Sequence, residues 1–91
     1  MVHLVTYDLK KPGQDYTSVH DAIKGCGSWW HYLESTWLVD SRMTAEQISA
    51  KVRRHMDEND RLLVIAVSGD HAGWLPQAAW DWINSHVPQY A

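Results

Sequence analysis

Asp8 is the residue whose type and position best suit it to chemistry. It ends the segment VHLVTYD, whose β-branched and aromatic residues predict a strand over residues 2–8. A carboxylate at a strand tip near a two-fold axis can meet its own copy. Two such carboxylates repel unless they share a proton or a hard cation such as Mg²⁺. The alternative is that Asp8 caps the turn at Pro12 and Gly13, and the sequence leaves both open.

Two basic pairs are the candidates for contact with nucleic acid. Lys10 and Lys11 follow Asp8, and Arg53 and Arg54 lie on a predicted helix. Doubled in a dimer, these side chains would offer a surface for a phosphate backbone. Ordinary solvated charge is the alternative. It agrees with the net charge of -3 over 91 residues, because nucleic-acid binders are usually strongly basic.

Other patterns that suggest catalysis or metal binding are weaker. Ser68, Asp70 and His71 adjoin in sequence, whereas triad members converge from separate segments, so a loop is expected there. The six histidines form no H-E-x-x-H motif and have no cysteine partners, so we expect no zinc site. Cys26 is the single cysteine, which fits a reducing, cytoplasmic setting. The longest apolar run, residues 62–67, is far shorter than the ~20 residues of a membrane helix.

Tryptophan is concentrated in the segment GSWWHYLESTWLVD, residues 27–40. The chain has six tryptophans and no phenylalanine, so tryptophan must do much of the apolar packing. Trp29 and Trp30 are adjacent on a predicted strand, and their side chains must point to opposite faces. We therefore expect core or interface packing rather than a platform for stacking nucleobases.

The elements that position these residues are expected to form one ferredoxin-like α+β domain over residues 1–91. A helix from about Asp15 follows the first strand, then two strands, WWHYL and TWLVD. Thr44 and Gln47 match a capping box for a second helix. The strand RLLVIAVSG and a short helix to about His86 complete the order, with a core at 1–68 and a Trp-rich tail at 69–91. This βαββαβ order predicts an antiparallel sheet with both main helices on one face.

The last of these strands predicts that both faces of the sheet are covered. Residues 62–67 are apolar in both phases, whereas a half-solvated strand alternates. Two helices can cover only one face, so the tail or a second copy of the chain must cover the other. We expect a homodimer whose interface includes or borders the tail.

Three stretches together resemble small bacterial proteins of the SinR family: TYDLKKPG at 6–13, WWHYLESTWLVD at 29–40 and NDRLLVIAVSG at 59–69. The chain is more distantly similar to the CRISPR-associated protein two family. That similarity rests on the tyrosine–aspartate ending of the first strand, the element order and a serine at the start of the third strand. It implies a ferredoxin-like dimer formed through the sheets. It also implies that Asp8 lies near its dimer mate and binds Mg²⁺ in a phosphodiesterase acting on RNA or DNA. VapD-type toxin ribonucleases share this architecture.

One loop departs from the wider family, which usually has a second acidic residue and an arginine soon after the aspartate. Here the loop reads LKKPG, without that arginine. The first hypothesis is a cytoplasmic, dimeric, nucleic-acid-associated protein that acts as a metal-dependent endonuclease. The second is a non-catalytic dimeric scaffold or adaptor that binds a protein partner, which the acidic balance favours. A toxin-like ribonuclease is the third.

Overall fold

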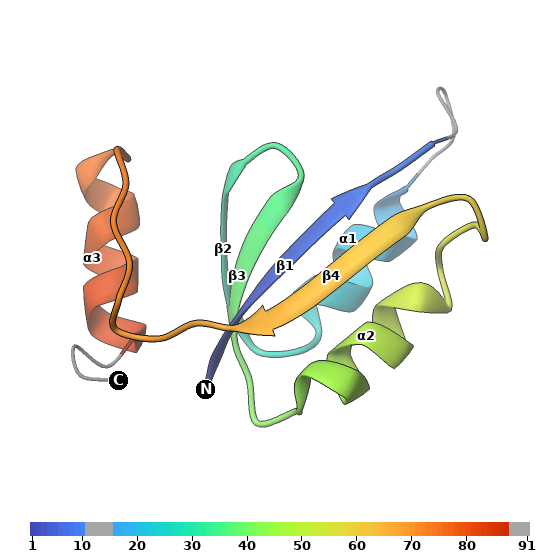
Figure 1. Ribbon diagram of the computed structural model, residues 1–91, viewed down its shortest axis with the longest axis horizontal. Helices are drawn as coiled ribbons and strands as arrows, with labels where there is room; N and C mark the ends of the chain where they lie inside the picture. The colour runs from blue at the N-terminus through green and yellow to red at the C-terminus, as the bar shows by residue number, and fades with distance from the viewer. Residues whose placement is uncertain (11–15, 88–91) are drawn as a thin grey trace.

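The computed structural model describes residues 1–10 and 16–87. Its elements, in chain order, are β1 (Val2–Asp8), α1 (Thr17–Lys24), β2 (Ser28–Leu33), β3 (Thr36–Asp40), α2 (Ala45–Arg53), β4 (Arg61–Ala66) and α3 (Gln77–His86). The four strands form one antiparallel sheet in the order β2-β3-β1-β4. Figure 1 shows α1 and α2 on one side of this small α+β fold and α3 on the other.

The local signals in the sequence correspond to these elements. The first strand has the predicted bounds. The capping box is confirmed: Thr44 Oγ1 accepts from the Gln47 N–H at 3.1 Å, and Gln47 Oε1 accepts from the Thr44 N–H at 2.9 Å. The helix start expected at Asp15 lies outside the described residues, and α1 is described from Thr17.

The last strand is shorter than the sequence predicts. β4 ends at Ala66, although the apolar run continues to Val67. Ala66 pairs with His3, and the Val67 N–H donates to the Val2 carbonyl at 2.9 Å. The ladder between β4 and β1, which begins at Val2, ends with these contacts.

The first core lies between the sheet and the pair α1 and α2. Both helices turn an apolar stripe toward the sheet, with Val19 and Ile23 on α1 and Ile48 and Val52 on α2 all fully buried. From the sheet come the remaining large buried side chains of this cluster: Val5, Tyr7, Trp37 and Val39. The Trp37 Nε1–H donates to the Tyr7 hydroxyl at 3.0 Å, which satisfies the buried indole.

A second core lies on the opposite face of the sheet, beneath α3. Ala79 and Ile83 of α3 pack there with Val2, Trp30 and Leu38. The cover is partial, because Leu63 and Ile65 on β4 remain 55% and 53% exposed. The tail and a second copy of the chain were alternative covers, and α3 covers side chains of β2, β3 and β1 but leaves Leu63 and Ile65 of β4 exposed.

The adjacent tryptophans do point to opposite faces. Trp29 lies 5.2 Å from Trp37, ring centre to ring centre, on the α1 side, and the Lys24 Nζ lies 5.0 Å from the Trp29 ring. Trp30 is buried in the second core. His31 stacks on Trp37 at 3.7 Å. Trp30 and Trp37 are therefore packing residues, as expected, and are closed to a stacking base.

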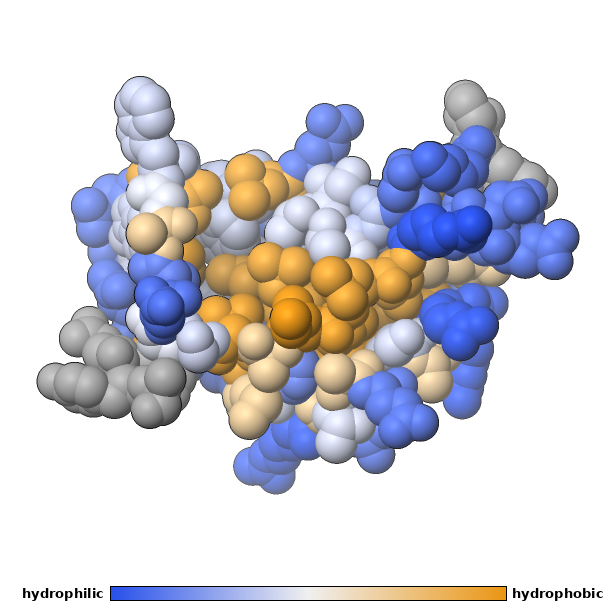
Figure 2. Space-filling model, viewed as in Figure 1, coloured by the Kyte–Doolittle hydropathy of each residue, from blue (hydrophilic) through white to orange (hydrophobic). Residues whose placement is uncertain are grey.

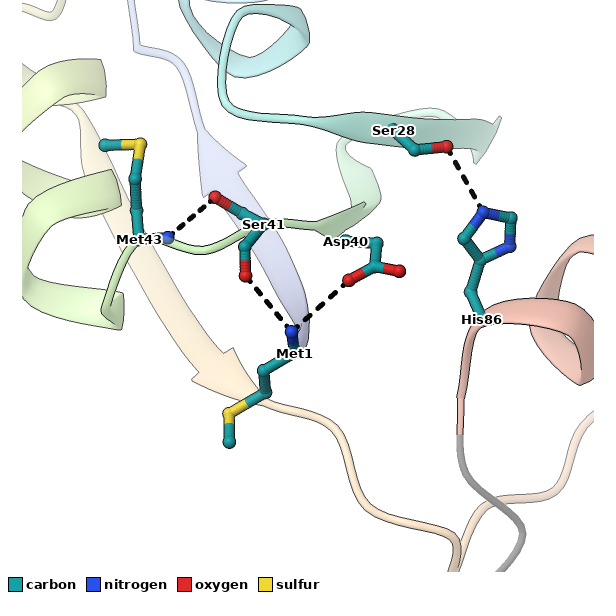
Figure 3. A network of polar contacts seen from close by, with 6 residues as sticks. All are labelled: Met1, Ser28, Asp40, Ser41, Met43 and His86. Carbon is teal, nitrogen blue, oxygen red and sulfur yellow. Dashed lines mark hydrogen bonds and ion pairs between the residues drawn. The ribbon is translucent and has the colours of Figure 1, made fainter.

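Polar contacts join the first residue of the chain and the end of α3 to the sheet (Figure 3). The Met1 amino group donates to Asp40 Oδ1 at 3.3 Å and to the Ser41 carbonyl at 3.1 Å. At the end of α3, His86 Nε2 lies 3.3 Å from Ser28 Oγ at the start of β2. This contact orients α3 along β2, so the helix docks by both apolar packing and a hydrogen bond.

Candidate functional site

Asp8 lies at the exposed end of β1, where the sequence placed it. It pairs in register with Arg61 of β4, but its ion pair is with the Lys10 Nζ. The Arg61 guanidinium instead donates to the carbonyls of Asp60 at 3.0 Å and Glu58 at 3.4 Å. The charge of Asp8 is therefore neutralised by a lysine of the loop that follows it. The pair is exposed, and exposed ion pairs contribute little to stability.

Asp60 is the buried carboxylate at this end of the molecule. Its Oδ1 accepts from the Lys10 N–H at 2.8 Å and from the Tyr16 hydroxyl at 3.3 Å, and its Oδ2 accepts from the Asp57 N–H at 2.8 Å. Burial alone would raise the pKa of this carboxyl, but the hydrogen bonds from Lys10, Asp57 and Tyr16 together lower it below its usual value. Asp60 thus ties the loop after β1 to the loop before β4.

This role is not visible in the local sequence. Asp60 belongs to the acidic run DEND, a pattern typical of a solvated turn rather than of a buried carboxylate. Its partners Lys10 and Tyr16 lie 50 and 44 positions away. Only the pairing of β1 with β4 brings these segments together.

The candidate basic residues divide between two surfaces. Arg53 lines a polar pocket with Asp57, Glu58, Asp60 and Arg61. Arg54, the next residue on α2, lines a different hollow with Lys51, because adjacent helix positions are rotated by about 100°. The Lys10 backbone N–H donates to Asp60, which lines the same pocket as Arg53, so Lys10 lies near Arg53. Lys11 lies outside the described residues.

The described residues of one chain do not assemble a magnesium site at Asp8. Magnesium needs several oxygen ligands in octahedral geometry. Asp8 is described with Lys10 as its ion-pair partner. Within residues 1–10 and 16–87 no three His, Cys, Asp or Glu side chains come together in a way that could hold a metal ion. A site of this kind would need further oxygen ligands beyond those of the described residues.

Ser68, Asp70 and His71 form a local turn, as expected. The Asp70 N–H donates to Ser68 Oγ at 3.2 Å, and His71 Nδ1 lies 3.0 Å from the Ser68 carbonyl. The imidazole therefore contacts a backbone carbonyl rather than the hydroxyl, and no nucleophile–base pair is formed.

An apolar pocket lies between α3, the loop before it and the second face of the sheet. Its volume is about 180 Å³. Among the residues that line it are Leu4, Trp30, Leu38, Leu75, Trp80 and Ile83. The exposed apolar strand β4 lies beside it, and Figure 2 shows the apolar surface at the centre of this view. The sequence predicted an apolar second face but gave no sign of a pocket.

No family model matches this chain, and neither does any curated protein or solved structure with which it was compared. In the described part of the chain, no helix is long and apolar enough to cross a membrane.

Proposed function

We propose that this protein is a non-catalytic homodimeric scaffold or adaptor with a ferredoxin-like fold. The fold assignment is supported by the sheet order β2-β3-β1-β4 and by the packing of α1 and α2 on one face. The observation that carries the function is the exposed apolar surface of β4, where Leu63 and Ile65 are both more than half exposed.

The place of β4 in the sheet makes this surface suitable for association. β4 is an edge strand, with β1 as its single sheet neighbour. An edge strand that is apolar and carries no charge between Leu62 and Ala66 is a template for pairing with another chain unless something covers it. A second copy would cover both this edge and the apolar side chains beside it, and a stable dimer would bury about 1,200–2,000 Å² of total surface.

A catalytic role has less support from the described residues. Asp8 is paired with Lys10, and Asp60 is held by hydrogen bonds from three donors. Neither carboxylate is arranged to share a ligand or a proton with the other. We therefore favour a role in holding partners over phosphodiester hydrolysis.

Association with RNA or DNA is the second candidate, and one observation favours it. Lys10, Arg53 and Arg61 lie at the same end of the sheet as the exposed Asp8. If two copies brought the Asp8 carboxylates together, they would supply the oxygen ligands that one chain lacks. This version is a metal-dependent endonuclease of the kind that the resemblance implies, or a toxin-like ribonuclease.

Sedimentation velocity over a wide range of protein concentration tests the dimer. We expect wild type to sediment as a dimer and the double variant Leu63→Lys, Ile65→Lys to shift toward monomer with an unchanged circular dichroism spectrum. Both side chains are largely exposed, so lysine can be accommodated in the folded chain. Ala50→Lys, at an exposed position on α2, is the matched control and should remain dimeric. A wild type that stays monomeric throughout would contradict the proposal.

Binding to duplex DNA and to single-stranded RNA at low and moderate salt separates the two candidates. A surface that tracks phosphates must weaken steeply as salt rises. The scaffold proposal expects no such binding and no Mg²⁺-dependent cleavage. Salt-sensitive binding reduced by Arg53→Ala, together with cleavage abolished by Asp8→Ala, would establish the nucleic-acid candidate instead.

A further inference from the structure

Trp74 is the most exposed large apolar side chain among the described residues. It lies in the loop between β4 and α3, and 99% of its surface is accessible. An indole left in water gives up the free energy that burial of its large apolar surface would provide. A fully exposed tryptophan therefore indicates a binding partner more strongly than a half-exposed leucine does.

The same loop forms one wall of the apolar pocket. Ala72 and Leu75 line the pocket, whereas Trp74, between them, does not. The indole of Trp74 is therefore outside the pocket that its neighbours in the loop line. Among the described residues it is left almost fully exposed, while an apolar cavity borders its own loop.

The pocket fits an indole in size and chemistry. Its volume is about 180 Å³, and a cavity of about 150 Å³ is enough to bind benzene. Trp30 and Trp80 supply aromatic surface to its lining. The lining of the pocket is thus apolar and aromatic.

From these observations we propose that two copies of this chain exchange Trp74: each indole inserts into the apolar pocket of the other copy. A two-fold axis beside the loop would bring each Trp74 to the partner's pocket, because the loop that bears the indole also borders the cavity. Such an interface is isologous and closes at two chains. Buried tryptophans at the centre of an interface commonly carry much of its affinity.

This inference rests on the homodimer of the proposed function and adds the contact that joins the copies. The first test is the dissociation constant of the dimer from sedimentation. Trp74→Ala should raise it at least about tenfold while leaving the circular dichroism spectrum unchanged. Tyr32→Ala removes an exposed aromatic side chain that does not line the pocket, and it should have a much smaller effect.

A second variant blocks the pocket and leaves Trp74 in place. Ala72 is exposed at the rim, so Ala72→Phe should obstruct the pocket without opening a cavity and should also give monomers. Ala78→Phe, at an exposed α3 position that does not line the pocket, is the control. Mixing Trp74→Ala with Ala72→Phe should restore association in part, because the second variant's Trp74 meets the first variant's open pocket. Each variant alone should associate more weakly than the mixture.

The outcomes distinguish this inference from the homodimer itself. If wild type and Trp74→Ala dimerise equally, the exchange is wrong and the homodimer stands. If wild type is a monomer at every concentration, both are wrong. If Trp74→Ala is monomeric but the mixture does not associate, Trp74 lies at the interface without entering the partner's pocket, and the exchange is again wrong.

N-acetyl-tryptophanamide provides an independent probe of the pocket. If it competes with the partner's indole, it should shift wild type toward monomer. It should not bind to the Ala72→Phe variant, whose pocket is blocked. Binding to the wild-type dimer without any change in its mass would mean that the pocket holds a small ligand or another protein's side chain. That result would overturn the exchange.

Discussion

At the scale of single residues, the buried polar groups are more informative than the exposed ones. His3 lies on β1, 3% exposed, and its Nδ1 has no hydrogen-bond partner among the described residues. Burial and the nearby amino group of Met1 lower the pKa of His3, and a hydrogen bond with the Met1 backbone offsets part of that effect. The folded protein therefore keeps this imidazole neutral.

We expect His3 to make the free energy of unfolding decrease at acidic pH. Below about pH 6.5 the unfolded chain takes up a proton that the folded His3 resists, so the free energy of unfolding decreases as the pH falls. Urea unfolding at several pH values should show this slope, and His3→Leu should flatten it. His55→Leu, at an exposed position, is the control and should keep a slope close to that of wild type. An unchanged slope in His3→Leu would contradict this assignment.

Asp60→Asn tests the carboxylate that joins the two loops. It should lower the free energy of unfolding at neutral pH by about 1–3 kcal/mol, because hydrogen bonds from Lys10, Asp57 and Tyr16 lose their charged acceptor. The pKa of Asp60 is lowered, so its contribution is full above about pH 3.9 and disappears as the pH falls through the folded value. Urea unfolding of Asp8→Asn, whose side chain is exposed, should show a much smaller change at neutral pH.

At the scale of elements, one glycine fixes how β2 joins β3. A Cβ added to Gly27 would lie 2.0 Å from the Asp40 carbonyl oxygen, a backbone atom that cannot turn aside. A Cβ added to Gly73 would meet nothing closer than the Trp80 ring at 4.0 Å. Gly27 therefore permits the close approach with which the paired strands begin at Ser28 and Asp40.

We expect Gly27→Ala to cost about 1–3 kcal/mol of stability, since the start of the β2–β3 pair must shift to relieve the overlap. Gly73→Ala is the matched control and should be near neutral. Thermal unfolding followed by circular dichroism measures both. Equal effects of the two substitutions would show that the backbone at Gly27 does not lie so close to the Asp40 carbonyl in solution.

At the scale of the whole molecule, one sheet serves two cores of unequal depth. Among residues 1–10 and 16–87, the α1 and α2 side buries ten in one cluster, and the α3 side buries six. The central strand β1 contributes to both cores and has a strand on each side. The helix α3 is therefore the element expected to open at the lowest free energy.

Hydrogen exchange should reveal this order. Amides of α3 should exchange faster than those of β1, and Ile83→Ala should speed exchange in α3 more than in β1 because it truncates the larger of the helix's buried side chains. The same substitution should lower overall stability by up to about 2–5 kcal/mol if α3 and the sheet unfold together. Equal protection of α3 and β1 would indicate a single cooperative unit.

The sequence by itself determined the elements and the faces they bury. The β-branched and aromatic segment at residues 2–8 and the capping box at Thr44 are local patterns, and the structure follows them. It also predicted that Trp29 and Trp30 diverge and that the sheet needs cover on two sides.

Only the tertiary structure decided how far α3 covers the second face, and which groups meet across the sheet. The three donors to Asp60, the pairing of Asp8 with Lys10 and the pocket beside Trp74 all depend on side chains brought together by strand pairing or helix docking. The physical reason is one of range. Propensity and periodicity act over a few residues, whereas a pocket or a buried carboxylate is stabilised by contacts between segments that are distant in the sequence.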